Sequence, residues 1–155
     1  MLLAIDPNLT CTGLALFEDG RLVATYPIRV ARSYTVSQMA QMFEELRGYV
    51  ASICEEGSKI TEVVCEQPFG PARELLILCQ DIKRWARRGR RAYFEYNPSQ
   101  IRNAGQRELN RLGVRQEYGL EQITDDECDA VMVGLHHLGV RRIMDEREAI
   151  ENILS

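Results

Sequence analysis

The stretch MLLAIDPNLTCTGLALFEDGRLVATYPIRV, residues 1–30, contains the pattern that decides the fold. Three apolar runs in it have the length and composition of β-strands, and they cover residues 2–5, 12–17 and 22–30. Asp19-Gly20 separates the second run from the third, and this dipeptide favours the positive φ angles of a type I′ hairpin turn. The stretch therefore predicts an antiparallel meander of three strands.

After the meander, helical and strand-like patterns alternate. Apolar residues recur at steps of three and four where a helix is expected, and short apolar runs indicate strands. The expected elements are a helix at 36–54, a strand at 61–65, a helix at 72–88 closed by Gly89, a strand at 92–96, a short helix from Asn97 with an irregular stretch to about 122, a helix at 125–138 and a helical tail at 141–155. This order predicts an α/β fold with a mixed five-stranded sheet flanked by helices.

Length and composition predict one globular domain over residues 1–155, with 45% hydrophobic residues and no run long enough for a membrane span. We expect a cytoplasmic protein, because the apolar start is too short for a signal peptide and lacks a basic flank. The five cysteines are widely spaced without a CxxC motif, which favours reduced thiols over disulfides or a zinc site.

Basic charge is concentrated in one segment. The chain has a net charge of −4, yet residues 83–115 contain ten basic and two acidic residues, a local charge of +8 against −12 in the remainder. Such a segment can form a positive surface for a polyanion. A solvated basic helix is the alternative, and charge alone does not separate the two.

Four acidic residues occupy positions from which a sheet-based site could be built. Asp6 and Glu66 end predicted strands, and Asp126 and Asp129 are three apart on one helix face. A turn before Pro7 and the helix dipole are the simpler explanations for Asp6 and Asp126. Together, clustered carboxylates are costly unless cations bind, and Mg²⁺ is the cation that suits oxygen ligands and substrate phosphates. The pattern therefore favours a pair of divalent ions and phosphodiester hydrolysis.

Three motifs in order resemble those of the RuvC-type Holliday junction resolvases. They are Ala4-Ile5-Asp6-Pro7-Asn8-Leu9-Thr10-Cys11-Thr12-Gly13, Val64-Cys65-Glu66-Gln67-Pro68-Phe69 and Asp126-Glu127-Cys128-Asp129-Ala130. The resemblance implies an RNase H-like fold and a homodimer that resolves four-way DNA junctions by paired symmetric nicks. It also implies that cleavage depends on Mg²⁺. From the carboxylate chemistry we expect two Mg²⁺ ions per active site, with Mn²⁺ as a substitute. The metal-binding catalytic acids would be Asp6, Glu66, Asp126 and Asp129.

The resemblance and the basic segment also suggest contacts with DNA. Phe69 matches an aromatic residue that the family uses beside the second acid, and an exposed ring there could stack on a base, whereas packing as a loop anchor is the alternative. Pro98-Ser99-Gln100-Ile101-Arg102 resembles a Pro-x-x-[Val/Ile]-Lys segment, so Arg102 would contact phosphate. The candidate DNA-binding residues are Phe69, Arg73, Arg84, Arg87, Arg88, Arg90, Arg91, Arg102, Arg107, Arg111 and Arg115, the last three on composition only.

Other functions stay open on the sequence alone. A different nuclease of the same fold, resembling the YqgF-type RNA-processing group, would cleave RNA. A non-catalytic junction-binding module would bind without giving products. An actin-like phosphotransferase or ATPase would need two such halves, and 155 residues supply one. For a homodimer, the helices at 36–54 and 72–88 are the candidate interface.

Overall fold

A computed structural model describes residues 1–30, 36–55, 59–68, 72–101 and 106–154. Its five-stranded sheet has the order β3-β2-β1-β4-β5. Strands β1 (Leu2–Asp6), β2 (Cys11–Glu18) and β3 (Arg21–Arg29) form the predicted antiparallel meander. Strand β4 (Glu62–Glu66) pairs in parallel with β1, and β5 (Ala92–Tyr96) pairs in parallel with β4. The predicted mixed sheet is thus confirmed.

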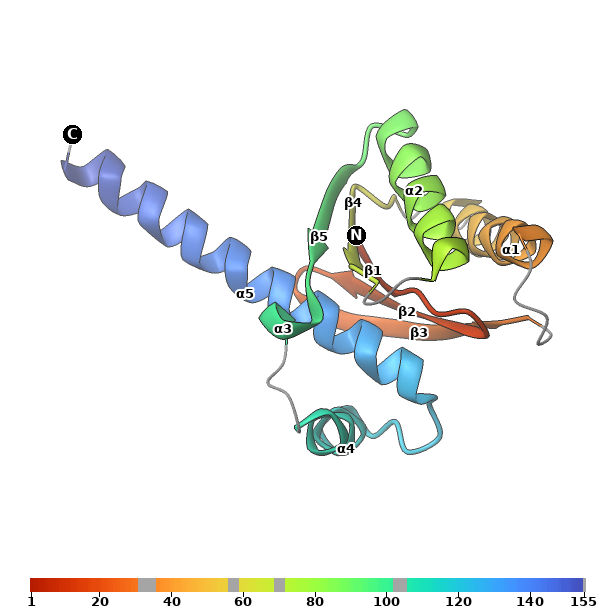
Figure 1. The fold of residues 1–155 in the computed structure, drawn as a ribbon. Coiled ribbons are helices and arrows are strands. Elements are labelled where there is room, and N and C mark those ends of the chain that lie inside the picture. The colour runs from red at the N-terminus through yellow and green to blue at the C-terminus, as the bar shows by residue number, and fades with distance from the viewer. Residues whose placement is uncertain (31–35, 56–58, 69–71, 102–105, 155) are drawn as a thin grey trace.

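The turn between β2 and β3 has the predicted chemistry. Asp19 and Gly20 adopt φ angles of 49° and 77°, both in the left-handed region that a type I′ turn requires. The short connection forces β2 and β3 to pair directly, which places the meander along one half of the sheet (Figure 1).

Helices cover both faces of the sheet (Figure 1). On one face lie α1 (Val36–Glu55) and α2 (Arg73–Arg88), and on the other α5 (Asp125–Leu154), with α3 (Pro98–Ile101) and α4 (Arg107–Tyr118) beside it. Side chains of β1 alternate between the two cores, because successive residues of a strand point to opposite faces: Leu3 and Ile5 pack toward α1 and α2, and Leu2 and Ala4 toward α5. The central strand β1 is therefore buried on both sides.

Two predictions of local structure were wrong. The stretch expected to be irregular contains α4, which ends at Gly119 in the left-handed conformation, φ 64°. The expected helix at 125–138 and the tail at 141–155 form one continuous helix, α5, with Gly139 inside it. A single glycine costs a helix only about 1 kcal/mol, so it weakens but does not end one.

The cysteines and the start of α5 agree with the sequence predictions. The five cysteines are free thiols. Thr124 and Glu127 form the reciprocal capping box that starts α5, with hydrogen bonds of 3.1 and 2.7 Å. Among the described residues, no helix combines the length and the apolar character that a membrane crossing would need.

Candidate active site

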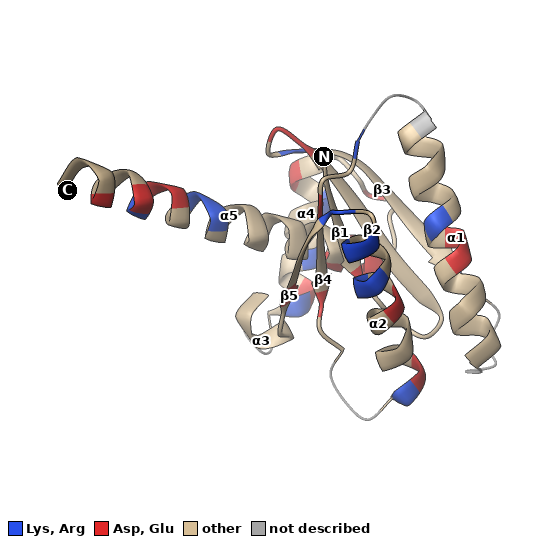
Figure 2. Cartoon of the chain, turned by 90° about the horizontal axis from the view of Figure 1, so that it is seen from above, with Lys and Arg blue, Asp and Glu red and all other residues tan. Residues whose placement is uncertain are grey.

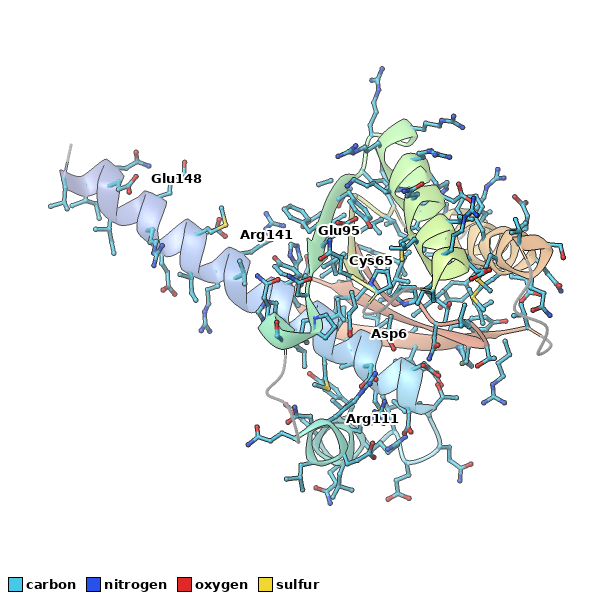
Figure 3. All side chains as sticks on the ribbon, in the orientation of Figure 1. Asp6, Cys65, Glu95, Arg111, Arg141 and Glu148 are labelled. Carbon is cyan, nitrogen blue, oxygen red and sulfur yellow. The ribbon has the colours of Figure 1, made fainter. Side chains whose placement is uncertain are left out.

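The fold brings the first two acids together at one edge of the sheet. Strands β1 and β4 are parallel neighbours, so Asp6 and Glu66 at their carboxyl ends lie side by side. Both are nearly buried, at 5% and 6% exposure. They line a cavity of about 300 Å³ together with Asn8, Gln67 and Arg107, among others. Ligand sites of open sheets favour such strand ends, which makes this cavity the candidate active site (Asp6 is labelled in Figure 3).

The first turns of α5 bring the other two acids to the same place. Burial raises the pKa of Asp6 well above its ordinary value, and the negative charges of Glu66, Asp129 and Asp126 raise it further. Glu66, Asp129 and Asp126 therefore lie close enough to Asp6 for their charges to act on it. Asn8 donates a hydrogen bond of 3.1 Å from Nδ2 to Oδ1 of Asp126, which ties the loop after β1 to the start of α5.

The placement of α5 depends on a close backbone approach at Gly13 of β2. A Cβ atom at this residue would lie 1.9 Å from the carbonyl oxygen of Asp126. No side chain fits there, because the nearest atoms belong to the backbone of α5. They can move away only if the start of the helix moves with them. Gly13 therefore sets the distance between the sheet and the helix that carries Asp126 and Asp129.

Gly13→Ala should move the start of α5 away from the sheet and so pull Asp126 and Asp129 from the other two acids. We expect a loss of about 1–3 kcal/mol in stability from overpacking, with a loss of any divalent-cation stabilisation. Gly48→Ala is the control, because a Cβ at Gly48 in α1 meets nothing within 4 Å. Thermal melting with and without Mg²⁺ measures both effects. Equal behaviour of the two variants would contradict this role of Gly13.

Asp129 is held by two arginines of α4. It is fully buried. Its Oδ2 accepts hydrogen bonds from Arg107 Nη2 at 2.5 Å and Arg111 Nη2 at 2.7 Å, and its Oδ1 accepts one from Arg111 Nε at 3.1 Å. Arg111 also contacts Glu108 at 2.5 Å and Asp125 at 3.3 Å (Arg111 is labelled in Figure 3). Both oxygens of Asp129 thus have cationic partners.

Three predicted DNA-binding arginines therefore face the protein's own acids. Besides Arg107 and Arg111, Arg115 pairs with Asp125 at 2.7 Å, and this contact lowers the pKa of Asp125. Nothing in these pairs tests a DNA contact, which stays a prediction. The sequence analysis missed the pairing because it depends on α4, whose helix was not foreseen.

The four carboxylates are the right type of ligand for divalent cations, but their side chains are not arranged in a complete coordination shell. Carboxylate oxygens are ligands that Mg²⁺ prefers, and here three of the carboxylates are buried and that of Asp126 is half-buried. No three His, Cys, Asp or Glu side chains in the described ranges are arranged as ready metal ligands. Since Arg107 and Arg111 occupy Asp129, binding of a cation to that carboxylate would require a rearrangement of these contacts.

The other candidate DNA-binding arginines that the structure describes lie toward the two ends of α2. Arg73 begins this helix, two residues before Leu75, which lines the cavity with Asp6 and Glu66. The others lie at or beyond the far end of α2, where β4 and β5 begin, and they are Arg84, Arg87, Arg88, Arg90 and Arg91. Basic residues thus lie toward both ends of α2 (Figure 2). The two ends are about 24 Å apart, because the helix has 16 residues. Phe69 and Arg102 lie outside the described residues.

Comparison with known proteins identifies the fold. No protein-family model matches the chain, and no curated protein sequence matches it significantly. Its structure is similar to that of T. thermophilus RuvC in complex with a Holliday junction substrate, with a TM-score of 0.71, 18% sequence identity, and 92% of this chain and 94% of that chain covered. It is also similar to the Fowlpox virus resolvase in complex with Holliday junction DNA, with a TM-score of 0.58, 14% identity, and 90% and 99% covered. The predicted RNase H-like fold, as in RuvC, is confirmed.

Proposed function

We propose that the protein is a structure-specific endodeoxyribonuclease that resolves four-way DNA junctions. The observation that carries the proposal is the cavity at the sheet edge. Asp6 and Glu66 line it, and two further lining residues, Asn8 and Arg107, are hydrogen-bonded to Asp126 and Asp129. The same fold occurs in two proteins solved with Holliday junction DNA, which favours this substrate over others.

The four acids would hold the cations of the reaction, with Mg²⁺ as the natural ion, Mn²⁺ as a substitute and two ions per site. Cations held there would supply the positive charge that activates a water and stabilises the departing oxygen of the cleaved phosphodiester. The cavity places Asp6 and Glu66 at its wall and Arg107 beside them, so the guanidinium of Arg107 is within reach of a phosphate that enters.

The proposal includes a homodimer. Two symmetric cuts on a junction require two equivalent sites, and a two-fold pair of subunits is the usual solution. Helices α1 and α2 are the candidate interface, and their exposed apolar side chains, Val36 and Leu76, lie in the first turn of each helix.

The test is cleavage of a synthetic four-way junction in the presence and absence of Mg²⁺, with linear duplex and RNA of matched sequence alongside. We expect Mg²⁺-dependent nicks in the junction alone, and linear product from a plasmid cruciform because both strands are cut by one dimer. Binding without products would favour the non-catalytic module. Cleavage of RNA instead of the junction would favour the RNA-processing type.

A further inference from the structure

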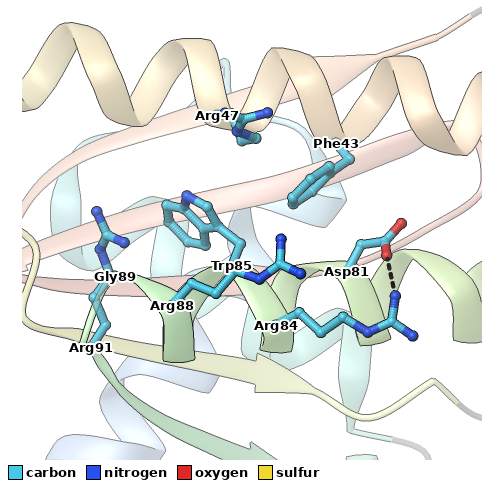
Figure 4. Close-up of a pocket in the computed structure, with 8 residues that line it drawn as sticks. All are labelled: Phe43, Arg47, Asp81, Arg84, Trp85, Arg88, Gly89 and Arg91. Carbon is cyan, nitrogen blue, oxygen red and sulfur yellow. Dashed lines mark hydrogen bonds and ion pairs between the residues drawn. The ribbon is translucent and has the colours of Figure 1, made fainter.

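A second cavity lies between α1 and α2, toward the end of α2 that is remote from the carboxylates. Its volume is about 440 Å³. Two aromatic rings and four guanidinium groups contribute to its lining: Phe43, Trp85, Arg47, Arg84, Arg88 and Arg91. Figure 4 shows the rings of Trp85 and Phe43 between the two helices, with Arg88 extended from α2 beside them.

The charge of this cavity is only partly neutralised. Arg84 pairs with Asp81 at 3.3 Å, and Arg47 pairs with Glu44 at 2.9 Å. Within the described ranges, Arg88 and Arg91 form no ion pair with a carboxylate, so two positive charges line the cavity without acidic partners.

The Arg91 side chain is packed against the protein and is not freely solvated. Its guanidinium lies over the Trp85 ring, 4.4 Å from the centroid. Its Nε is buried and has no hydrogen-bond partner among the described residues, which is unfavourable for a buried donor. The preceding residue, Arg90, adopts φ 54°, which is uncommon for a residue other than glycine.

Gly89 makes room for this arrangement. A Cβ atom at residue 89 would lie 1.8 Å from Nη1 of Arg91, so any side chain there displaces the guanidinium. The φ of Gly89 is −80°, which any residue can adopt, so its small size rather than its flexibility is what the site uses. The space left by Gly89 and the contact with the Trp85 ring thus fix the position of the Arg91 guanidinium at the cavity.

We infer that this cavity is a phosphate-binding site. Guanidinium groups match the oxygens of a phosphate with paired hydrogen bonds, and Arg88 and Arg91 have that capacity unused. The Trp85 ring lies against the Arg91 guanidinium and so holds this group at the cavity. The inference deepens the proposed function, because an arm of a junction cut at Asp6 and Glu66 could extend about 24 Å along α2 to reach it.

The experiment uses the single tryptophan of the chain, Trp85, as its reporter. Emission of the full-length protein is followed in EDTA, at constant ionic strength, while chloride is replaced by inorganic phosphate, by a 5′-mononucleotide or by a short DNA duplex. We expect a saturable change with phosphate. Response to the duplex as well as to phosphate identifies a nucleic-acid strand as the source of the phosphate, whereas response to phosphate and mononucleotide alone identifies a small ligand.

Two variants and one matched control decide the outcome. Arg88→Gln with Arg91→Gln should weaken the apparent affinity at least tenfold, and Gly89→Ala should weaken it without changing any charge. Arg142→Gln with Arg147→Gln removes the same charge from the exposed part of α5 and should have no effect. A non-saturable response in the parent protein, or equal affinity in all variants, would overturn the inference. Because no cation or cleavage is involved, the result is independent of whether junctions are cut.

Discussion

Asp6→Asn should reduce Mg²⁺-dependent cleavage of a four-way junction by about 10³-fold, because loss of a charged cation ligand removes several kcal/mol of transition-state stabilisation. Asp6 lines the cavity with Glu66 and is 5% exposed, so an amide of the same shape changes its charge and little else. The rate of nicking under single-turnover conditions measures the effect. Asp19→Asn is the control, since this acid lies in the β2–β3 turn. Undiminished cleavage by the Asp6 variant would remove this carboxylate from the mechanism.

The same substitution should raise stability when no cation is present. Burial and the charges of Glu66, Asp129 and Asp126 raise the pKa of Asp6 in the folded protein. A group whose pKa is raised on folding contributes most below its unfolded pKa, and that contribution is lost as the pH rises through the folded pKa. In EDTA at pH 8, Asp6→Asn should therefore melt above the parent protein, and the difference should shrink on acidification.

Divalent cations should reverse that order. A ligand that binds only the folded state stabilises it by mass action, so Mg²⁺ should raise the melting temperature of the parent protein more than that of the variant. A variant that is less stable than its parent in EDTA at pH 8 would show that Asp6 is held by contacts stronger than the repulsion described here.

The sequence predicted those parts of the fold that local chemistry determines. The Asp19-Gly20 turn and the capping box of Thr124 and Glu127 are local signals, and both form as expected. The convergence of Asp6 and Glu66 followed from the parallel pairing of two apolar strands. Helix α4 was missed because its buried side chains, Arg111 and Val114, do not form an apolar stripe.

Contacts between distant elements could not be predicted in the same way. Arg107 and Asp129 are 22 residues apart in the sequence, and no local pattern in either segment predicts that they pair. The sequence showed the basic segment, and its charge alone left a positive surface and a solvated basic helix as alternatives. In the structure that charge has two uses, since the arginines of α4 neutralise acids of α5, and Arg88 and Arg91 line a separate cavity.

Arg111→Met should destabilise the protein by about 3–5 kcal/mol, since removal of one partner of a buried ion pair leaves a charge without compensation. Arg111 is 9% exposed and Asp129 is fully buried, and three hydrogen-bonding groups of Arg111 contact acids. Methionine keeps much of the apolar stem, so the loss reports mainly on the guanidinium. Urea denaturation in EDTA measures the change. Arg47→Met is the control, because its pair with Glu44 is exposed and such pairs contribute about 0–1 kcal/mol.

A double-mutant cycle separates the ion pair from simple packing. If the cost of Arg111→Met comes from the stranded carboxylate, adding Asp129→Asn should recover a large part of it, giving a coupling energy of about 1–3 kcal/mol. Arg107→Met should cost less than Arg111→Met, because the Arg107 side chain is 47% exposed and Asp129 keeps Arg111 as a partner. Additive losses in the double variant would mean that Arg111 stabilises α4 through its stem and its contacts with Glu108 and Asp125, and that Asp129 has its charge balanced by Arg107 alone.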